Sequence, residues 1–333
     1  QGYAHGKPIP LPSHIFGNIR TVNRIGSAIY PIANAARGFA PFNAIARKLL
    51  NIHPARELPR FEQSLHRWFA QRRRRESNVH VQAAACPRVV LFPDCFTTYT
   101  EPHIGRAAIR CLESLGYRVV LPRIGCCGRA MISTGQLAQA QQACHRTATE
   151  LVLAMKEHNA IAIVGCEPSC ISAIKDDWLD LDMNLDAAML QSLADRMYMI
   201  EHFVESQWDS HPRRPDVANP ASDAPVVLHA HCHQKALWGA ESSAAILRRL
   251  FGPRLNVLDS GCCGMAGAFG YMRDHYDLSM AIAEQSLGHH LRAAPDDATI
   301  LAPGTSCRQQ IHEAMRRRAM HPIELIAQTF DIS

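Results

Sequence analysis

The residues of this sequence with the clearest chemical potential are its cysteines, twelve in all, nine of which fall into two similar sets. The first set is Cys95, Cys126, Cys127, Cys166 and Cys170, and the second is Cys232, Cys262, Cys263 and Cys307. Each set contains an adjacent pair in a glycine-rich stretch, RIGCCGRA in one and DSGCCGMAGAFGY in the other. Neighbouring cysteines do not form an easy disulfide, but two thiols splayed from one tight turn can reach one metal cluster. The sequence therefore predicts two related metal sites.

The chemistry of the thiols narrows the kind of metal. Soft thiolates select zinc, copper(I) or iron–sulfur clusters, and all-thiolate sets are typical of iron–sulfur clusters. The five thiols of the first set exceed the four that tetrahedral zinc uses. Glycines around each pair leave room for a bulky group close to the backbone. These features favour an iron–sulfur cluster over a single ion.

Three histidines flank one of these cysteines in the segment HAHCH. In an extended segment alternate residues share a face, so His229, His231 and His233 are predicted to point away from Cys232. We expect structural histidines or groups that supply protons or orient a partner, with metal ligation the minor alternative. The three cysteines outside the sets are expected to be free thiols: Cys86, Cys111 and Cys144.

The elements that must position the cysteines alternate between strand and helix from Pro87 onward. The predicted strands cover residues 88–94, 117–123, 160–165, 226–231, 254–260 and 298–304. The principal predicted helices cover residues 102–115, 131–157 (as one long helix or two), 234–250 and 272–293, and further helical segments are predicted after residue 170 up to about Trp208. Such alternation predicts parallel sheets with helices on both faces, which is an α/β fold. Ligands of these folds bind beyond the carboxyl ends of the strands, where the cysteines of both sets fall.

The second half of this pattern repeats the first. A shift of about 137 positions places Cys95 on Cys232 and Cys170 on Cys307, with the Cys-Cys-Gly segments nearly superposed. We therefore predict two duplicated Rossmann-like parallel-sheet domains, 86–208 and 226–333, joined by a linker over 209–225. Cys166 falls on Pro303, so the second set lacks this partner.

The segment before the first domain has a different composition. Residues 1–85 carry 13 Lys/Arg against 3 Asp/Glu, and the whole chain has a net charge of +5. Prolines predict an irregular lead-in over residues 1–15, at Pro8, Pro10 and Pro12. Helical spacing predicts helices over 16–52, broken at Pro31 and Pro41, and over 60–74. We interpret residues 1–85 as a helical basic connector without a thiolate site.

The charge and hydropathy of the chain indicate which partners and which cellular compartment to expect. The chain has 47% hydrophobic and 20% charged residues, which are globular values, and no apolar run reaches the ~20 residues of a membrane span. Reduced thiols predict a cytoplasmic protein, with a peripheral contact to the inner membrane left open for the basic block. No nucleic acid partner is expected, because aromatic interleaving is weak. The start without Met predicts a piece of a longer chain, or a processed one.

The motif Cys–x30–Cys-Cys-Gly–x38–Cys–x3–Cys and its repeat resemble the cysteine-rich "CCG" domain pair over about residues 87–320. This pair occurs in heterodisulfide reductase, in the iron–sulfur subunit of glycolate oxidase and in lactate-utilisation proteins. The segments PDCFTTYTEPHIGRAA, HAHCHQKALWG and APGTSCRQQI look closer to the FAD-linked oxidases that are D-lactate or D-2-hydroxyacid dehydrogenases. The resemblance implies that the chain is the C-terminal part of such an enzyme.

The resemblance also implies a function and its cofactors. The nine cysteines of the two sets would hold [4Fe–4S] clusters, and FAD would lie in the missing upstream part. The chain would be the electron-transfer module of this oxidoreductase, receiving electrons from flavin and ferredoxin-like domains and passing them to a quinone, a cytochrome or another acceptor. Two alternatives stay open: a heterodisulfide-type disulfide reductase that uses Cys166, and a structural zinc-binding module. The absent partner at Pro303 leaves open an ordinary four-thiolate cluster, or none, in the second set.

Overall fold

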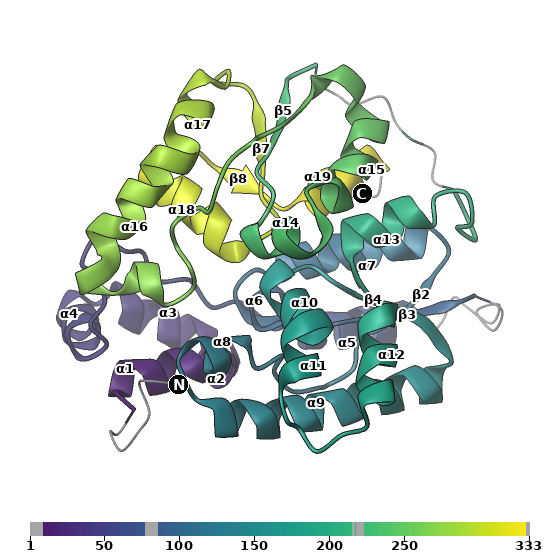
Figure 1. The fold of residues 1–333 in the computed structure, drawn as a ribbon, viewed down its shortest axis with the longest axis horizontal. Coiled ribbons are helices and arrows are strands. Elements are labelled where there is room, and N and C mark those ends of the chain that lie inside the picture. Colours follow the sequence, from purple (N-terminus) through teal and green to yellow (C-terminus); the bar gives the residue numbers. More distant parts are fainter. Residues whose placement is uncertain (1–8, 77–85, 215–216, 218–222, 331–333) are drawn as a thin grey trace.

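The computed structural model describes residues 9–76, 86–214, 217 and 223–330 (Figure 1). Its framework is two four-stranded parallel sheets with the strand orders β2-β1-β3-β4 and β6-β5-β7-β8. The first sheet contains β1 (Arg88–Leu91), β2 (Arg118–Val120), β3 (Ala160–Gly165) and β4 (Met197–Met199). The second contains β5 (Val226–Leu228), β6 (Leu255–Val257), β7 (Thr299–Leu301) and β8 (Ala319–Met320). The equal strand orders confirm the prediction of two duplicated α/β units.

The strands form where short runs of branched apolar residues are buried on both faces. In β1, Val89 and Val90 are fully buried, and Val89 pairs with Val119 on one side and Ala162 on the other. Parallel strands covered by helices on both faces favour such continuous apolar runs. The predicted helical segments up to about Trp208 are interrupted by β4, and neither β4 nor β8 was predicted, because strands of two or three residues are too short to show a pattern.

Helices lie beside both sheets (Figure 1). In the first unit they are α6 (Cys95–Tyr99), α7 (Pro102–Ser114), α8 (Arg129–Ser133), α9 (Leu137–His158), α10 (Pro168–Ser172), α11 (Trp178–Asp180), α12 (Ala187–Arg196) and α13 (Ile200–Ser206). In the second they are α14 (Cys232–Trp238), α15 (Glu241–Phe251), α16 (Tyr276–Ala283), α17 (His289–Ala293), α18 (Thr305–Met315) and α19 (Pro322–Thr329). The helix predicted over 131–157 is divided between α8 and α9.

The described part of the N-terminal segment, residues 9–76, forms five helices, in agreement with its predicted helical character. They are α1 (Leu11–Gly17), α2 (Ile19–Ala28), α3 (Tyr30–Gly38), α4 (Ala40–Leu49) and α5 (Leu65–Glu76). The prediction of an irregular lead-in up to residue 15 is wrong, because α1 begins at Leu11 with Pro12 in its first turn. Proline is tolerated there since the first N–H groups of a helix have no partner within it. Pro8 lies outside the described residues.

The two units share a core rather than meeting at a thin contact. One hydrophobic cluster joins Val89 and Leu91 of the first sheet to Val226, Leu228 and Leu301 of the second. Helix α7 packs against α19, and α13 packs against α15. The relative position of the two cysteine sets therefore follows from a packed interface. Among the described helices, none has the length and apolar character needed to span a bilayer.

The predicted linker over 209–225 begins as a packed segment. His211 is buried, its Nε2 lies 2.9 Å from the carbonyl oxygen of Val204, and its Nδ1 lies 3.0 Å from the hydroxyl of Tyr117. A carbonyl only accepts hydrogen bonds, so Nε2 carries the proton and Nδ1 accepts from Tyr117. Burial lowers the pKa of His211, which keeps the ring neutral in this arrangement.

A buried carboxyl group at the interface predicts a pH dependence of stability. Both carboxyl oxygens of Glu201 are buried without a hydrogen-bond partner among the described residues, and burial raises the pKa of this group to about 8. The nearby Nδ1 of His321 lies 3.5 Å away, and burial lowers the pKa of that ring to about 3, so the two groups are neutral neighbours. Protonated Glu201 therefore suits the folded state.

We expect the unfolding free energy of the wild type to fall relative to Glu201→Gln as the pH rises from about 4.5 to 8. In this window the unfolded chain has ionised Glu201 and the folded protein has not, so each pH unit costs at most about 1.4 kcal/mol. Above the folded-state pKa the difference levels off. Urea unfolding at pH 5, 7 and 9 measures this, and parallel pH profiles for the two proteins would contradict the expectation.

Candidate functional site

The first cysteine of each set opens a short helix at the end of the first strand of its sheet. Cys95 begins α6, and the Oδ1 atom of Asp94 accepts hydrogen bonds of 2.9 Å from the N–H groups of Phe96 and Thr97. Cys232 begins α14 in the same way, and Nδ1 of His231 accepts from the N–H of His233 at 3.2 Å. Side-chain caps thus fix both helix starts, and with them the two thiols.

Each adjacent cysteine pair is followed by a position that only glycine can occupy. Gly128 has φ 79° and Gly264 has φ 82°, in the left-handed region that L side chains rarely adopt. A Cβ atom on Gly128 would lie 2.3 Å from Sγ of Cys144, and one on Gly264 would lie 2.4 Å from the carbonyl oxygen of Ser279. The glycines therefore allow the turn that places both thiols beside the sheet.

In the first set, four thiols from three loops come together. Sγ of Cys127 lies 3.0 Å from Sγ of Cys170, and the Cys126 thiol is a further hydrogen-bonding neighbour of Cys127. Cys95 is close enough for its charge to raise the pKa of Cys127 and Cys170. All four side chains are buried, and none forms a disulfide.

The structure puts the fifth predicted ligand, Cys166, in different surroundings. Its side chain packs in the cluster shared by the two units, whereas Cys126, Cys127 and Cys170 pack in a separate cluster of the first unit. Burial raises the pKa of the Cys166 thiol, and the charges of Asp94 and Glu201 add to this effect. The four thiols common to both sets are therefore assembled, whereas Cys166, which has no counterpart in the second set, packs in the core shared by the two units.

In the second set, the thiols form a chain of neighbours that reaches the surface. Cys262 contacts Cys232 and Cys263, and Cys263 contacts Cys307. Hydrogen bonds from Cys232 and Cys263 hold the pKa of Cys262 well below its usual range, and the N–H of Gly264 donates to its Sγ at 3.3 Å. Cys263 and Cys307 are buried, while Cys232 and Cys262 are half-buried. The second set is thus the more accessible one.

The prediction for the three histidines rested on an extended segment through Cys232, and this premise is wrong. Strand β5 ends at Leu228 and Cys232 already belongs to a helix, so the residues between them do not alternate as in a strand. Nε2 of the buried His229 has no hydrogen-bond partner among the described residues, and Nδ1 lies 2.7 Å from Oγ of Ser260. The pKa of Cys307 is lowered first by the hydrogen bond from Cys263 and then by the nearby rings of His231 and His229. Both rings therefore lie at the second set.

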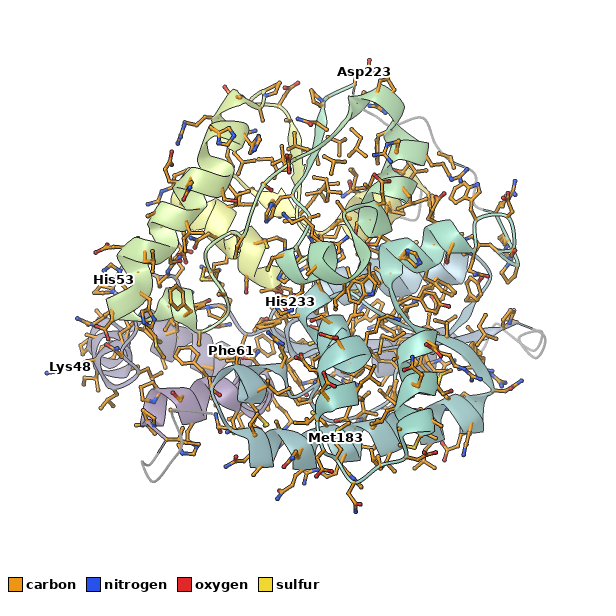
Figure 2. The ribbon with its side chains drawn as sticks, viewed as in Figure 1. Lys48, His53, Phe61, Met183, Asp223 and His233 are labelled. Atoms are coloured by element: carbon orange, nitrogen blue, oxygen red, sulfur yellow. The ribbon has the colours of Figure 1, made fainter. Side chains whose placement is uncertain are left out.

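His233 instead reaches the first unit, at the boundary between the two halves (Figure 2). Its Nδ1 lies 2.8 Å from Oγ of Ser172, in the helix that carries Cys170. Burial lowers the pKa of His233 to about 4, with the positive charge of Arg129 as the next cause. The ring is therefore neutral at neutral pH and joins the loops of the two sets.

Several residues that support the first set carry no motif that sequence reasoning could recognise. The indole Nε1 of Trp178 donates to the carbonyl oxygen of Cys127 at 2.9 Å, and Oγ1 of Thr147 donates to that of Cys126 at 2.9 Å. The Cys144 thiol, expected to be an uninvolved thiol, donates to the carbonyl oxygen of Cys127 at 3.3 Å. These three residues could be recognised only from the packing of α9 and of the turn after α10 against the cysteine loop.

An arginine from the N-terminal segment also supports this set. The guanidinium of Arg20 in α2 donates to the carbonyl oxygens of Pro93 at 2.7 Å and Ile124 at 2.6 Å. These carbonyls precede Cys95 and Cys126 by two residues each. The basic segment therefore holds two cysteine loops together by named contacts, which its overall charge did not reveal.

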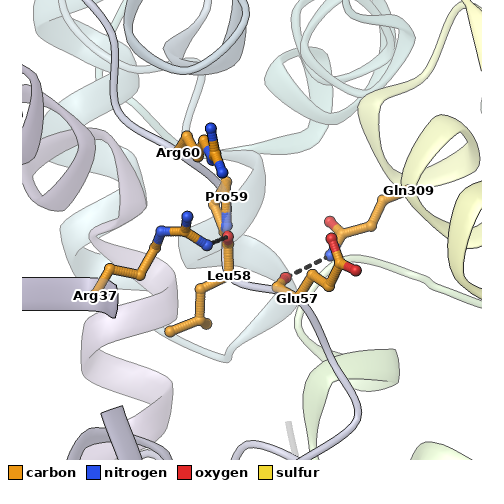
Figure 3. A pocket seen from close by; sticks show the side chains of 6 residues that line it. All are labelled: Arg37, Glu57, Leu58, Pro59, Arg60 and Gln309. Atoms are coloured by element: carbon orange, nitrogen blue, oxygen red, sulfur yellow. Dashed lines mark hydrogen bonds between the residues drawn. The ribbon is translucent and has the colours of Figure 1, made fainter. Parts of the chain in front are cut away.

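A surface pocket lies where the N-terminal segment meets α18 (Figure 3). The residues that line it are Arg37, Glu57, Leu58, Pro59, Arg60 and Gln309. Nε2 of Gln309 donates to the carbonyl oxygen of Glu57 at 2.8 Å, which ties the segment to the helix of Cys307. None of the lining residues is a thiol, so the pocket adds no donor to the cysteine sets.

Comparison with known proteins identifies the first unit. Residues 89–175 match the family model described as "CCG: Cysteine-rich domain", and this range contains all five cysteines of the first set. The chain carries a CCG cysteine-rich domain. The matched range extends from β1 to the π-helical turn that follows α10, so the family is recognised on the loops whose geometry is described above.

The chain is homologous to subunits and parts of dehydrogenases. It is 25% identical over 320 residues to one of the subunits of anaerobic glycerol-3-phosphate dehydrogenase of Escherichia coli, covering 96% of this chain and 77% of that relative. It is 28% identical over 242 residues to "D-2-hydroxyglutarate dehydrogenase" of Pseudomonas putida, covering 72% of this chain and 22% of that protein. It is 21% identical to "Lactate utilization protein A" of Geobacillus kaustophilus, over 72% of this chain and 98% of that protein.

The donors of the CCG domain and its repeat fit an iron–sulfur cluster in type, number and burial. Each set brings four cysteine sulfurs together, as four-thiolate clusters require. Among the described residues, no group of three or more His, Cys, Asp or Glu side chains is arranged to hold a single metal ion. The contact of 3.0 Å between Cys127 and Cys170 means that the sulfurs would have to spread apart to ligate different irons.

The exposure of the two sets predicts their reactivity without metal. In the metal-free, reduced protein we expect iodoacetamide to modify Cys262 well before the first-set thiols, because Cys262 is half-exposed and favours the thiolate, whereas the first-set thiols are buried. Mass spectrometry of peptides after timed quenching measures this order. The exposed Cys86 serves as the internal reference for a freely reacting thiol. Modification of Cys127 or Cys170 at the rate of Cys262 would contradict the structure.

Proposed function

We propose that both cysteine sets hold iron–sulfur clusters and that the chain is the electron-transfer module of a flavin-linked dehydrogenase. The observation that carries this proposal is the pair of four-thiol sets at equivalent strand ends of two units that share one packed interface. The proposed ligands are the nine cysteines of the two sets, with [4Fe–4S] as the cluster type. Four thiols of each set hold the iron in this proposal, and Cys166 is an additional ligand of the first set that the iron does not require. The proposed domain boundaries are those expected from the sequence, with 86–208 and 226–333 as the cluster-bearing domains.

The chain's own residues would bind, orient and shield these groups. When bound, a cluster supplies a one-electron acceptor and donor. Asp94 and His231 fix the helix starts of Cys95 and Cys232, and burial of the first set excludes water. His229, whose Nε2 has no hydrogen-bond partner among the residues that the structure describes, is suited to donate a hydrogen bond to a sulfur of the second set. Such hydrogen bonds to sulfur and solvent exclusion tune the potential of a cluster.

The accessibility of the second set supports a direction of transfer. An external acceptor reaches the half-exposed Cys232 and Cys262 more closely than the buried first set. We propose that electrons enter through the first set and leave from the second to a quinone, a cytochrome or another acceptor. The reduced thiols favour a cytoplasmic location, and a peripheral membrane contact through the basic N-terminal segment belongs to the same proposal.

In this proposal the substrate binds to a partner domain or subunit and not to this chain. The relatives are named for glycerol-3-phosphate, D-2-hydroxyglutarate and lactate, which suggests that the electron-transfer part is combined with different substrate-binding parts. We propose FAD in a partner domain or subunit, a ferredoxin-like segment between it and this chain, and a D-2-hydroxyacid such as D-lactate as the substrate.

This division of labour is tested with the purified chain after anaerobic reconstitution with iron and sulfide. We expect its visible absorbance to bleach with dithionite and to return when an oxidising dye is added, because the clusters store and release electrons. D-lactate should bleach nothing, since the chain holds no flavin site in this proposal. The metal-free protein is the control. Bleaching by D-lactate alone, or no colour after reconstitution, would overturn the proposal.

A further inference from the structure

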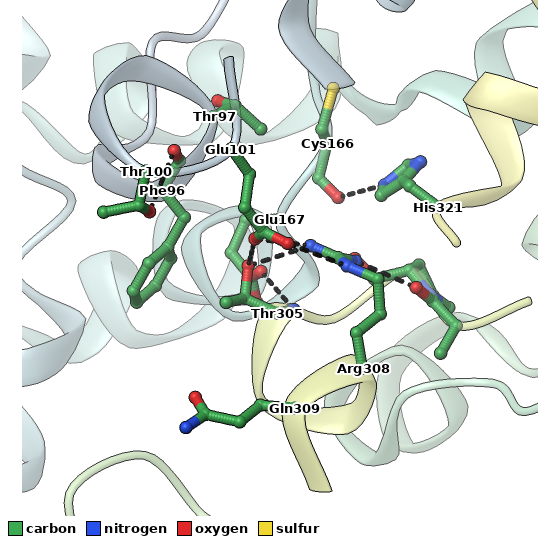
Figure 4. Close-up of polar contacts among 12 residues, drawn as sticks. Phe96, Thr97, Thr100, Glu101, Cys166, Glu167, Thr305, Arg308, Gln309 and His321 are labelled. Atoms are coloured by element: carbon green, nitrogen blue, oxygen red, sulfur yellow. Dashed lines mark hydrogen bonds and ion pairs between the residues drawn. The ribbon is translucent and has the colours of Figure 1, made fainter. Parts of the chain in front are cut away.

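Glu167, the residue after Cys166, makes hydrogen bonds to the cysteine-bearing segments of both units, and Figure 4 shows it beside Thr305 of the second unit. Its Oε1 accepts from the N–H and the hydroxyl of Ser169 at 3.3 and 2.8 Å, which caps α10, the helix of Cys170. Its Oε2 accepts from the N–H of Thr305 at 2.9 Å, at the start of α18, the helix of Cys307. The side chain is 3% exposed, so these bonds form away from water.

The duplication explains why one carboxylate serves two helices. Glu167 and Gly304 occupy the same position, immediately before α10 and α18, and Gly304 supplies no side-chain cap. A Cβ atom on Gly304 would lie 2.3 Å from Cδ2 of His231, so the ring of His231 fills the place where a local cap would stand. The first residue of α10 is Pro168, which has no N–H, whereas the first residue of α18 is Thr305, whose N–H needs an acceptor.

Neighbouring contacts hold the same junction. Arg308 of α18 pairs with Glu101 at 2.7 Å and donates to the carbonyl oxygens of Ala302 and Pro303. Nε2 of His321 lies 2.9 Å from the carbonyl oxygen of Cys166, to which it donates. Among these contacts, the bond from Glu167 joins a residue adjacent to one cysteine of the first set with a residue two positions before Cys307.

We propose that Glu167 is a positioning residue that links the start of the Cys170 helix to the start of the Cys307 helix and so connects the two cysteine sets. The bonded route runs from Cys170 through the first turn of α10 to its cap Glu167, across one hydrogen bond to Thr305, and along two residues to Cys307. A role of Glu167 in electron transfer between the sets rests on the proposed function. A change at Glu167 in the first domain should therefore alter the second set.

The decisive variant is Glu167→Asp, because it separates the two caps. Aspartate is a good cap for its own helix, but its shorter side chain cannot span the distance to Thr305. In the metal-free protein we expect amide hydrogen exchange at 305–307 to accelerate about fivefold to tenfold, the usual effect of a lost cap. Exchange at 169–171 should stay near wild type. The control is Glu205→Asp, which shortens a carboxylate bonded to Arg249 at the same interface away from the cysteines.

A second measurement distinguishes an effect of Glu167 on the second cysteine set from a general effect on protein stability. In reconstituted protein with a Cys127→Ala background, where iron is confined to the second set, Glu167→Asp should shift the midpoint potential of the remaining cluster at unchanged iron content. If no iron binds, the proposed function fails, but the exchange comparison still decides the role of Glu167. Unchanged exchange at 305–307, or loosening of 169–171 alone, would overturn the inference.

A variant on the other partner guards against misfolding of Glu167→Asp. Thr305→Pro removes the N–H donor at a position where proline is favoured, as Pro168 occupies it in the first domain. We expect the same faster exchange at 306 and 307 and the same shift of the second-set potential. Thr305→Val, which keeps the N–H, is its control. Equal behaviour of the proline and valine variants would contradict the proposed connection.

Discussion

Replacing Cys127 with alanine is expected to abolish iron binding at the first set and to leave the second set loaded. Cys127 lies at the centre of its set, 3.0 Å from the sulfur of Cys170 and in hydrogen-bond contact with Cys126, so its loss removes a shared ligand. Iron and acid-labile sulfide per chain should fall by about half, since each set is expected to hold about four irons. Colorimetric assay of both after anaerobic reconstitution measures the loss.

Two control variants, one at the equivalent cysteine of the second set and one at a cysteine outside both sets, show whether this result is specific. Cys263→Ala should remove the other half of the iron, because Cys263 has the same central place between Cys262 and Cys307. Cys86→Ala, at an exposed cysteine outside both sets, should leave the iron content unchanged. Equal iron in wild type and Cys127→Ala would show that the thiols, although assembled, do not hold the metal.

Replacing Arg56 with methionine is expected to lower the unfolding free energy by about 3–5 kcal/mol, the cost of breaking a buried ion pair. The guanidinium is fully buried and pairs with Glu313 at 2.5 Å. It also donates to Gln310 at 2.7 Å, to Ser279 at 2.8 Å and to the carbonyl oxygen of Gly270 at 2.6 Å. Methionine fills much of the space but leaves the Glu313 carboxylate without its buried partner.

The measurement is urea unfolding followed by circular dichroism, with a matched exposed arginine as the control. Arg248 pairs with Glu241 while 53% and 64% of the two side chains remain exposed, so Arg248→Met should cost only about 0–1 kcal/mol. Because Arg56 holds the loop of Gly270, which follows Cys263, we also expect Arg56→Met to load less iron at the second set. A similar cost for both variants would contradict the assigned role of Arg56.

The sequence was sufficient to predict the sheets and the placement of the cysteines. Buried apolar runs such as the one ending at Leu91 and the repeated Cys-Cys-Gly segment are local signals. Their repetition at one spacing identifies a duplicated α/β fold. The carboxyl ends of parallel strands lie at one edge of a sheet, and from this rule the sequence alone predicts that Cys95 lies close to Cys126 and Cys127.

The remaining features depend on contacts between distant segments, which periodicity does not encode. Arg20 and Arg56 belong to a segment that looked like a basic connector, and only the packed structure assigns each to a cysteine loop. The expected orientation of His229 and His231 rests on an extended segment, and the short strand ends before them. The separate packing of Cys166 and the double cap at Glu167 likewise follow from how the two units pack together.

The most direct test of the central claim is quantitation of iron, acid-labile sulfide and zinc in the anaerobically reconstituted chain, with EPR of the dithionite-reduced sample. Wild-type protein is predicted to hold about eight irons with a matching amount of sulfide and to give a signal that disappears on oxidation. Cys166→Ala, measured alongside, is predicted to retain iron in both sets, because four thiols in each set are assembled without it. Zinc in place of iron, or a folded protein that binds neither metal, would contradict the account.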